Sequence, residues 1–542
     1  MASIFSVEGR LVDVHRQRIY PARITVEGNR ISEIIELKED ELRTQHFIMP
    51  GFTDAHIHIE SSMLVPSEFA RLAVVHGTVA TVSDPHEIAN VCGVKGVEYM
   101  IANGETVPFK FNFGAPSCVP ATTFETAGAE ITVDEIDQLL QRKDVLYLSE
   151  MMNFPGVLAR DQAVMSKIES AKKHKKPVDG HAPGLRGVEA RTYIDAGIST
   201  DHECFTEEEA KEKIGYGMKI LIREGSAAKN FDALIPLLKE FPNQVMFCSD
   251  DKHPDSLVEG HINELCERSI RAGVDIFSTL KAACVNPVLH YQLKVGLLRL
   301  NDFADFICVE NLEQFKVLRT YINGELVAEN GVTLIPLSKI STTPLNNFHI
   351  SSISSSDLLA DKSSYNKFPA IEALDGQLIT NKLKIPEGCT LPDVSLDLLK
   401  IVVVNRYQKS KVAMGWIKNF RLGRGAIASS VAHDSHNIVA VGVDDESICH
   451  AVNAVIEARG GVSCVDADRA VMLPLPVAGL MSEEDGYAVA KHYSAIDKAA
   501  KDLGSTLSSP FMTLSFMALL VIPHLKLSDK GLFDGADFKI LV

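Results

Sequence analysis

The sequence lacks any segment that could cross a membrane as a helix. Such a helix needs about 20 consecutive, mostly apolar residues, and no run of that kind occurs among the 542 residues. The longest candidate, residues 511–522, contains Thr513 and Ser515 and is followed by Pro523. The first residues also lack the basic region and the long apolar region of a signal peptide. We therefore expect neither a membrane anchor nor a leader.

The sequence is also poor in positive charge. It contains 54 Lys and Arg against 71 Asp and Glu, which gives a formal net charge of −17. A protein that binds duplex nucleic acid needs a basic face, whereas the longest basic run here, residues 172–176, stands just before Pro177. Cations are favoured at the C-terminal end of a helix, so we interpret this run as a helix end. Nucleic acid is not an expected partner.

No two of the ten cysteines are spaced as Cys-x-x-Cys. This excludes a zinc ribbon and the Cys-x-x-Cys motif of the zinc-dependent nucleobase deaminases. Free thiols are typical of a reducing compartment. We therefore expect a cytoplasmic protein.

The two flanks of the first 335 residues are rich in short strand-like segments. Residues 24–27 and 29–34 alternate in polarity around Gly28, which is a hairpin signal. A similar pattern recurs at residues 306–309 and 317–327. We predict that residues 1–47 and 291–335 together build one small β-sandwich domain around a long insertion.

The insertion, residues 48–290, repeats a different unit. An apolar run ends in polar or ionisable residues, and a helical stretch follows it. The eight runs are residues 47–58, 79–82, 109–113, 145–148, 177–179, 198–200, 219–222 and 245–248. Eight βα units in about 250 residues are typical of a (β/α)8 TIM-like barrel. The predicted fold class is thus α/β, with the barrel inserted in the small β-sandwich domain.

Two further regions follow the barrel. Residues 336–365 are rich in Ser, Thr and Asn, and we interpret them as a linker. Residues 366–542 combine a strand at 399–404 with helical stretches at 447–459 and 485–503. They predict a C-terminal α+β domain.

The ends of the predicted barrel strands carry an unusual set of side chains. In a barrel, ligands bind where the carboxyl ends of the strands meet. The side chains at five of these ends are His56, His58, Glu150, His181, His202 and Asp250. Four imidazoles and two carboxylates suit two divalent transition metals, and Glu150 can bridge them. Each residue alone has an ordinary structural explanation, and buried, hydrogen-bonded histidines are the alternative for the whole set.

Such a centre has a definite chemistry. Two metal ions lower the pKa of bound water towards neutrality and so supply hydroxide as a nucleophile. Asp250 would bind one metal and also accept the proton of the attacking water, then return it to the leaving group. The expected reaction is hydrolytic attack on the carbon of an amide, a cyclic amide or an amidine.

At this point the sequence resembles the amidohydrolase superfamily and, within it, the bacterial adenine deaminase family. The motifs are PGFTDAHIHIESSM (50–63), SDPHEIANV (83–91), GHAPG (180–184), TDHE (200–203), REGSAA (223–228), CSDD (248–251) and GAIASSVAHDSHN (425–437). The first motif is shared across the superfamily, and the segments at 83–91 and 425–437 are more particular. One departure from the family pattern is Asn419, which stands where glycine is usual.

The resemblance implies the deamination of adenine to hypoxanthine and ammonia, in purine salvage or adenine catabolism. It implies two divalent ions, Mn²⁺ or Fe²⁺, with Mn²⁺ favoured. Glu150 takes the place of the modified lysine that bridges the metals in many relatives. The alternatives are another amidohydrolase, acting on a different aminopurine or a cyclic amide, and a catalytically dead scaffold relative. A homodimer is expected from general frequencies alone.

Other positions are weaker candidates. Asp251 could accept a hydrogen bond from a purine ring N–H, and Glu60 and Arg223 could contact the substrate; capping and other structural roles are the alternatives. His86 and Glu87 could transfer protons or hold an additional metal, or form a loop hydrogen-bond pair. The remaining candidates are His433 and His436, which could reach the active site from the C-terminal domain, and His253, which we expect beside the site or in solvent.

Overall fold

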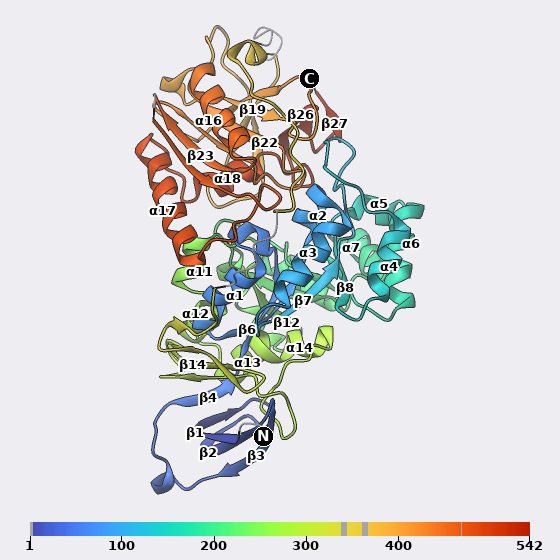
Figure 1. Cartoon of the computed structure of the whole chain (residues 1–542). Helices are drawn as coiled ribbons and strands as arrows, with labels where there is room; N and C mark the ends of the chain where they lie inside the picture. Colours follow the sequence, from blue (N-terminus) through green and yellow to red (C-terminus); the bar gives the residue numbers. More distant parts are fainter. Residues whose placement is uncertain (1–3, 338–343, 360–366, 468, 542) are drawn as a thin grey trace.

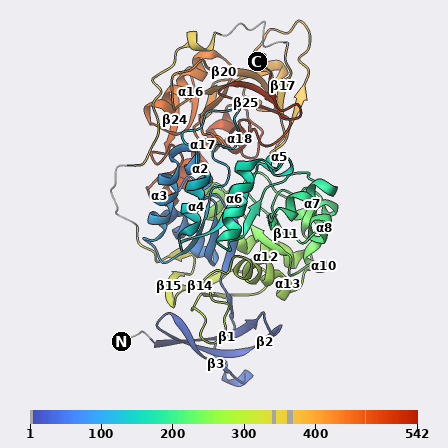
Figure 2. The same ribbon diagram turned by 90° about the vertical axis from the view of Figure 1, so that its right-hand side faces the viewer.

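The computed structural model describes residues 4–337, 344–359, 367–467 and 469–541. Figure 1 shows three regions in line: an N-terminal sheet at one end, a barrel in the middle and the C-terminal region at the other end. Figure 2 shows the same order from the side. Within these described ranges, no helix has both the length and the apolar character required to cross a bilayer.

The N-terminal sheet is built from both sides of the barrel sequence. Its eight strands lie in the order β16-β15-β14-β13-β4-β1-β2-β3. They are β1 (Ile4–Asp13), β2 (Arg18–Glu27), β3 (Arg30–Glu36), β4 (Phe47–Pro50), β13 (Phe306–Val309), β14 (Val317–Ile322), β15 (Glu325–Glu329) and β16 (Val332–Thr333). The flanks meet at β4, where Ile48 pairs with Leu11 on one side and with Cys308 on the other. Because the chain leaves this sheet at β4 and returns at β13, the barrel is an insertion in it.

The first apolar run, residues 47–58, forms two strands instead of one. Its first half is β4 of the N-terminal sheet, and its second half is the first barrel strand, β5 (Phe52–Ile57). The chain crosses between them at Gly51, where a Cβ would lie 2.3 Å from Cγ1 of Val79. Only glycine allows this close approach.

The barrel contains all eight expected strands. They are β5, β6 (Thr78–Ser83), β7 (Lys110–Ala115), β8 (Val145–Met151), β9 (Val178–Gly180), β10 (Thr200–Asp201), β11 (Lys219–Arg223) and β12 (Val245–Cys248). Parallel ladders run through β5–β9 and through β10–β12. Single parallel bridges, Val178 to Ile198 and Ile57 to Asp250, join the two sets and close the barrel. The TIM-like barrel is thus confirmed.

Helices cover the outside of the barrel. They are α1 (Pro66–Ala73), α2 (His86–Cys92), α3 (Val94–Gly104), α4 (Val133–Gln141), α5 (Phe154–Leu158), α6 (Gln162–Lys173), α7 (Gly187–Asp195), α8 (Glu207–Gly215), α9 (Phe231–Leu234), α10 (Leu237–Glu240), α11 (Pro254–Glu259), α12 (Ile262–Arg271), α13 (Ile276–Leu280) and α14 (Asn286–Tyr291), with a π-helical turn at Lys281–Val285. The basic run at 172–176 lies at the end of α6, as expected, and Lys173 pairs there with Asp137.

The C-terminal region is an α+β unit around a second eight-stranded sheet. Its order is β18-β17-β20-β19-β22-β21-β23-β24. The strands are β17 (Ala370–Ala373), β18 (Thr380–Leu383), β19 (Leu399–Val404), β20 (Ala413–Lys418), β21 (Ala426–Ser429), β22 (Ile438–Gly442), β23 (Gly461–Asp466) and β24 (Arg469–Pro474). The accompanying elements are α16 (Asp445–Glu457), α17 (Gly486–Asp502), α18 (Pro510–Phe516) and a small sheet of β25 (Leu525–Ser528), β26 (Gly531–Asp534) and β27 (Lys539–Ile540).

This region packs on the barrel. Helix α17 lies against α11 and α1, and Arg71 of α1 forms ion pairs with Glu68 and with Asp485, which caps α17. Of the segment predicted as a linker, residues 338–343 and 360–365 lie outside the described residues, and the part between them buries Phe348 and Leu358. The domain boundaries given above remain predictions.

Candidate active site

Two histidines at the end of β5 start the site. His56 is in the strand and His58 follows it, so their side chains lie on the same side of the extended chain. Their Nε2 atoms are 3.2 Å apart, and the two side chains are 1% and 3% exposed. Nδ1 of His58 faces the carbonyl oxygen of Asp84 at 3.2 Å. This contact fixes the ring so that Nε2 points into the barrel mouth.

Glu150 of β8 lies between two groups of imidazoles. Its Oε1 is 3.4 Å from Nε2 of His58. Its Oε2 is 2.9 Å from Nδ1 of His181 and 3.2 Å from Nε2 of His202. One carboxylate oxygen thus faces each group, which is the arrangement that a bridging carboxylate needs.

Asp250, just after β12, completes the set. Its Oδ1 is 3.1 Å from Nε2 of His58 and 3.5 Å from Nε2 of His56. Its φ of 57° is left-handed, a conformation that Asp tolerates better than most residues. Backbone hydrogen bonds hold it there, from its N–H to the His56 carbonyl and from the His58 N–H to its own carbonyl. The structure therefore brings together all six residues that the sequence predicted as metal ligands.

The two carboxylates of this cluster keep their negative charge in spite of burial. Burial alone would raise the pKa of Glu150, but the imidazoles of His181 and His202 hold that pKa well below its usual value. Burial would also raise the pKa of Asp250, but Arg223 and the histidines lower it. Both carboxylates are therefore ionised at neutral pH.

The donor set fits divalent metal ions. The Nε2 atoms of His56 and His58 face each other at hydrogen-bonding distance. Two lone pairs would repel each other there, so a proton or a cation must lie between the two nitrogens. Four imidazoles and two ionised carboxylates, all buried, are a ligand set that transition metals prefer. The metal ligands remain a prediction, beside the alternative of buried histidines that hydrogen-bond to carboxylates, such as Nδ1 of His181 to Glu150 at 2.9 Å.

His86 and Glu87 begin α2 and lie beside this centre. The His86 ring packs edge-on against His58, with centroids 4.5 Å apart. Its Nδ1 is 3.3 Å from Asp84 and 3.5 Å from Oε1 of Glu150, and its Nε2 is 3.5 Å from Oε1 of Glu87. His86 thus stands between the carboxylates of Glu150 and Glu87.

The C-terminal region reaches the barrel mouth through His433 and His436. Both are in the loop between β21 and β22, and both contact the Glu87 carboxylate. Burial would lower the pKa of His433, but Glu87 and Asp251 raise it to about 9. His253 is buried instead of solvated: its ring packs on Tyr493, and burial lowers its pKa to about 3.

The three residues predicted to contact substrate differ in position. Asp251 lines the cavity, where it accepts a 2.5 Å hydrogen bond from Oγ of Ser61. Glu60 accepts a hydrogen bond from the Ile88 N–H, and burial raises its pKa to about 7. Arg223 donates to Glu203 and Asp250. Glu60 and Arg223 are not among the residues that line the cavity, so their substrate contacts remain predictions.

Two acidic residues of the barrel at the site were not assigned a role from the sequence. Glu203 lines the cavity next to His202, and Asp84 accepts hydrogen bonds from the backbone N–H groups of His86 and Glu150. A signal existed for both, because each is at or next to the end of a barrel strand within a quoted motif. Local pattern alone could not show which way either carboxylate points.

The cavity at this centre is small and lies between the barrel and the C-terminal region. Its volume is about 20 Å³, room for little more than one water molecule. The barrel supplies its floor and walls, and four residues of the C-terminal region line it from above: Leu378, His433, Asp434 and Leu519. The active site is therefore shared between the barrel and the C-terminal region.

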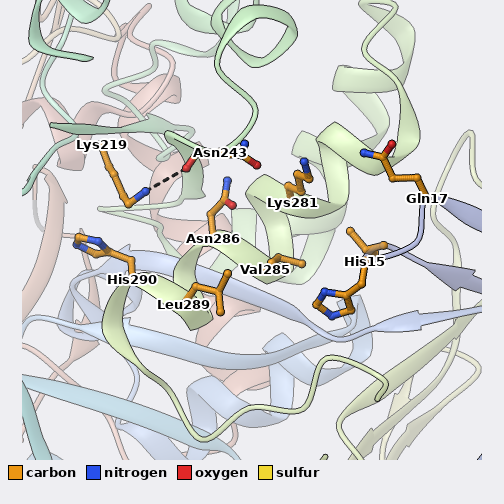
Figure 3. Close-up of a pocket in the computed structure, with 10 residues that line it drawn as sticks. His15, Gln17, Lys219, Asn243, Lys281, Val285, Asn286, Leu289 and His290 are labelled. Carbon is orange, nitrogen blue, oxygen red and sulfur yellow. Dashed lines mark hydrogen bonds between the residues drawn. The ribbon is translucent and has the colours of Figure 1, made fainter. Parts of the chain in front are cut away.

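A larger hollow lies at the opposite end of the barrel, where β11 begins at Lys219. Figure 3 shows the side chains that line it. It has a volume of about 540 Å³, and its lining includes His15, Lys219 and Lys281. None of the described residues that line it is a carboxylate. It lacks the donor set for a metal ion and is not the centre of the reaction.

Comparisons with known proteins agree with this geometry. Residues 47–327 match the model of the amidohydrolase family, and residues 376–539 match that of the adenine deaminase C-terminal domain. An adenine deaminase of Salinibacter ruber is 53% identical over 547 residues, covering 100% of this chain and 99% of the relative. The corresponding protein of Sulfurovum is 53% identical over 99% of both chains, and that of Borreliella burgdorferi 48% identical over 99% of both. The chain therefore belongs to the adenine deaminase family of amidohydrolases.

Proposed function

We propose that this chain catalyses the hydrolytic deamination of adenine to hypoxanthine and ammonia at two divalent metal ions. The observation that carries the proposal is the convergence of four imidazoles on Glu150 and Asp250 at the barrel mouth. The relatives named adenine deaminase, about half identical over the whole chain, support adenine as the substrate.

The six ligand residues would hold the ions in two groups. His56, His58 and Asp250 form one group, and His181 and His202 form the other, with Glu150 between them. When bound, the ions act as Lewis acids and make water a nucleophile near neutral pH. The carbonyl oxygen of Asp84 orients His58 from behind, as the partners of metal-binding histidines usually do.

Asp250 is placed to move the proton. Its Oδ1 faces the imidazoles of His56 and His58, where it can accept the proton of the attacking water. The same atom can return a proton to the amino group, so that ammonia leaves and the C–N bond breaks. The overall balance is adenine plus water to hypoxanthine plus ammonia.

Three other side chains would assist. The Asp251 carboxylate lines the cavity and can accept a hydrogen bond from a ring N–H of the purine. His86 lies within 3.5 Å of both Glu150 and Glu87. Protons could therefore pass from the centre towards Glu87 through His86.

The residues of the C-terminal region that line the cavity also have a role in this proposal. Leu378 and Leu519 are the apolar residues that the C-terminal region contributes to the cavity lining. They would keep bulk water from the reacting atoms, which strengthens electrostatic interactions there.

The finer assignments are part of the proposal. Ligands of histidine and carboxylate type suit both Mn²⁺ and Fe²⁺, and we favour Mn²⁺. All ten cysteines are free thiols, which supports a cytoplasmic location. A homodimer is proposed on general frequency alone.

The test is turnover by the purified full-length chain supplied with Mn²⁺. The ultraviolet spectrum of adenine should change to that of hypoxanthine, with one ammonia released per purine. A panel of guanine, 2,6-diaminopurine and cyclic amides measures the alternatives. No turnover of adenine at millimolar concentration, with metal bound, would overturn the proposal.

A further inference from the structure

Arg223 carries a guanidinium that is shared between two carboxylates of the site. The residue is at the end of β11, and its side chain is 2% exposed. Nη1 donates to Oδ2 of Asp250 at 2.8 Å and also to Oε1 of Glu203, and Nη2 donates to Oε2 of Glu203 at 3.2 Å. The planar guanidinium has several donors in a fixed geometry, which lets it hold both carboxylates at once.

The contact with Arg223 gives the two carboxylate oxygens of Asp250 different partners. Oδ2 is bound by Arg223, while Oδ1 faces Nε2 of His56 and His58 at 3.5 and 3.1 Å. A carboxylate without the arginine could rotate about its Cβ–Cγ bond or present both oxygens to a cation. Arg223 therefore limits Asp250 to one oxygen on the metal side.

The contact with Glu203 has a different consequence. Oε1 of Glu203 is 3.5 Å from Nε2 of His202 and 3.7 Å from Nδ1 of His181. These are the same two ring atoms that face Glu150. His181, His202 and Glu203 alone form a group that could hold a cation. Among the residues that the structure describes, only the guanidinium of Arg223 gives this buried carboxylate a cationic partner other than an imidazole.

We propose that Arg223 is a positioning residue that orients Asp250 through one oxygen and keeps Glu203 from becoming a metal ligand. The inference rests on the metal centre of the proposed function. Lysine could not replace it, because a single ammonium cannot hold both carboxylates in a fixed plane.

The test is a titration of the chelator-treated full chain with Mn²⁺, in which binding is measured by calorimetry. Turnover is measured separately. Wild type should bind two equivalents. In Arg223→Met, the released Glu203 should tighten one binding step, and the freed Asp250 should weaken the other, each by at least ten-fold. The kcat for adenine should fall at least 100-fold.

The second variant, Arg223→Met/Glu203→Gln, separates the two effects. The tightened step should disappear because the amide is a poor metal ligand, while the weakened step should remain. If the titration of Arg223→Met matches that of wild type, or if Glu203→Gln does not remove the tightened step, the inference is wrong. If Arg223→Met does not fold, Arg223→Lys is titrated in its place. The affinity of at least one of its two Mn²⁺ binding steps should then differ from that of wild type.

The control is Arg268→Met. Arg268 also pairs with two carboxylates, Glu224 and Asp232, but on the outside of the barrel. Its titration and kcat should match wild type. A wild type that binds two Mn²⁺ and deaminates adenine, with normal titrations in the Arg223 variants, would defeat this inference alone. A wild type that binds no Mn²⁺ would defeat the proposed function itself.

Discussion

The carboxylate of Glu87, in the barrel, contacts the imidazole of His433, 346 positions later in the chain. His436 contacts the other oxygen of the same carboxylate. The Glu87 and His436 side chains are 1% exposed and that of His433 3%. Helix α2 of the barrel and the β21–β22 loop of the C-terminal region are thus joined by one buried carboxylate at the edge of the active site.

Replacing His436 by Ala should loosen this junction. Burial lowers the pKa of His436 below its usual value, so its neutral imidazole donates a hydrogen bond to Glu87. Without it, the buried Glu87 carboxylate would lose a hydrogen-bond partner, which costs about 1–3 kcal/mol. We expect a lower melting temperature and at least a ten-fold lower kcat/KM for adenine, with bound metal unchanged. His450→Ala, at an exposed position of the same region, is the control. Wild-type kinetics and melting in His436→Ala would refute the role of the junction.

The proposed metal ligands should give a larger effect. Replacing His56 or Asp250 by Ala would remove a proposed ligand atom from a buried site, so turnover should fall by at least 10³-fold and bound metal should decrease. The circular dichroism spectrum should remain that of a folded protein, because neither side chain is part of the apolar core. Elemental analysis and a spectrophotometric assay are the measurements.

The matched control for the ligands is His15→Ala. His15 lines the hollow at the opposite end of the barrel (Figure 3). His15→Ala should keep full activity and full metal content. Should His56→Ala keep two ions and near-normal turnover, the ligand assignment fails.

Much of the barrel could be predicted from sequence because each strand is a local pattern. An apolar run followed by a polar end is visible without knowing the partners, as with residues 145–150. The junction between β4 and β5 was not visible, because it depends on the close approach of Gly51 to Val79. The same holds for Arg223, whose partners lie 20 and 27 positions away and are chosen by side-chain direction.

The unusual residue Asn419 shows how a local departure is accommodated. It adopts a φ of 76°, a left-handed conformation that Asn tolerates better than most residues other than glycine. Its side chain donates to the Ala373 carbonyl at 2.8 Å, and its N–H donates to Asp397 at 2.7 Å. The loop is therefore formed with Asn in the place of glycine.

Asp251 should affect substrate more than metal. It lines the cavity but is not one of the six ligands, and burial together with the charge of Asp250 raises its pKa. Replacing it by Asn removes the charge and keeps the shape, so kcat/KM should fall about 10- to 100-fold if a hydrogen bond to the purine is weakened by about 1.4–2.7 kcal/mol. Steady-state kinetics with parallel metal analysis measure this, and Ser61→Ala, which removes only the hydrogen bond to Asp251, should have a smaller effect. An unchanged kcat/KM in Asp251→Asn would exclude a contact with the purine.

Lys526, in β25 of the C-terminal region, offers a test of how the stability of the protein depends on pH. Its Nζ is fully buried and donates to the carbonyls of Leu378 and Phe516 at 2.6 and 2.9 Å. Burial lowers its pKa to about 7, against about 10.5 for a solvated lysine. Between these values the unfolded chain binds more protons than the folded one, so the contribution of Lys526 to stability rises with pH, by up to about 1.4 kcal/mol per unit.

In Lys526→Met this gain is absent. The melting temperature of wild type should therefore rise relative to that of Lys526→Met as the pH increases from 7 towards 10, and the difference should level off below pH 7. Differential scanning calorimetry at matched ionic strength measures it, and Lys530→Met, an exposed lysine four positions later, tests whether loss of a positive charge alone produces the trend. A difference that stays constant across this range would mean that Lys526 keeps its proton in the folded protein. The charged ammonium group of Lys526 would then donate to the carbonyls of Phe516 and of the cavity-lining Leu378 at every pH at which the enzyme is active.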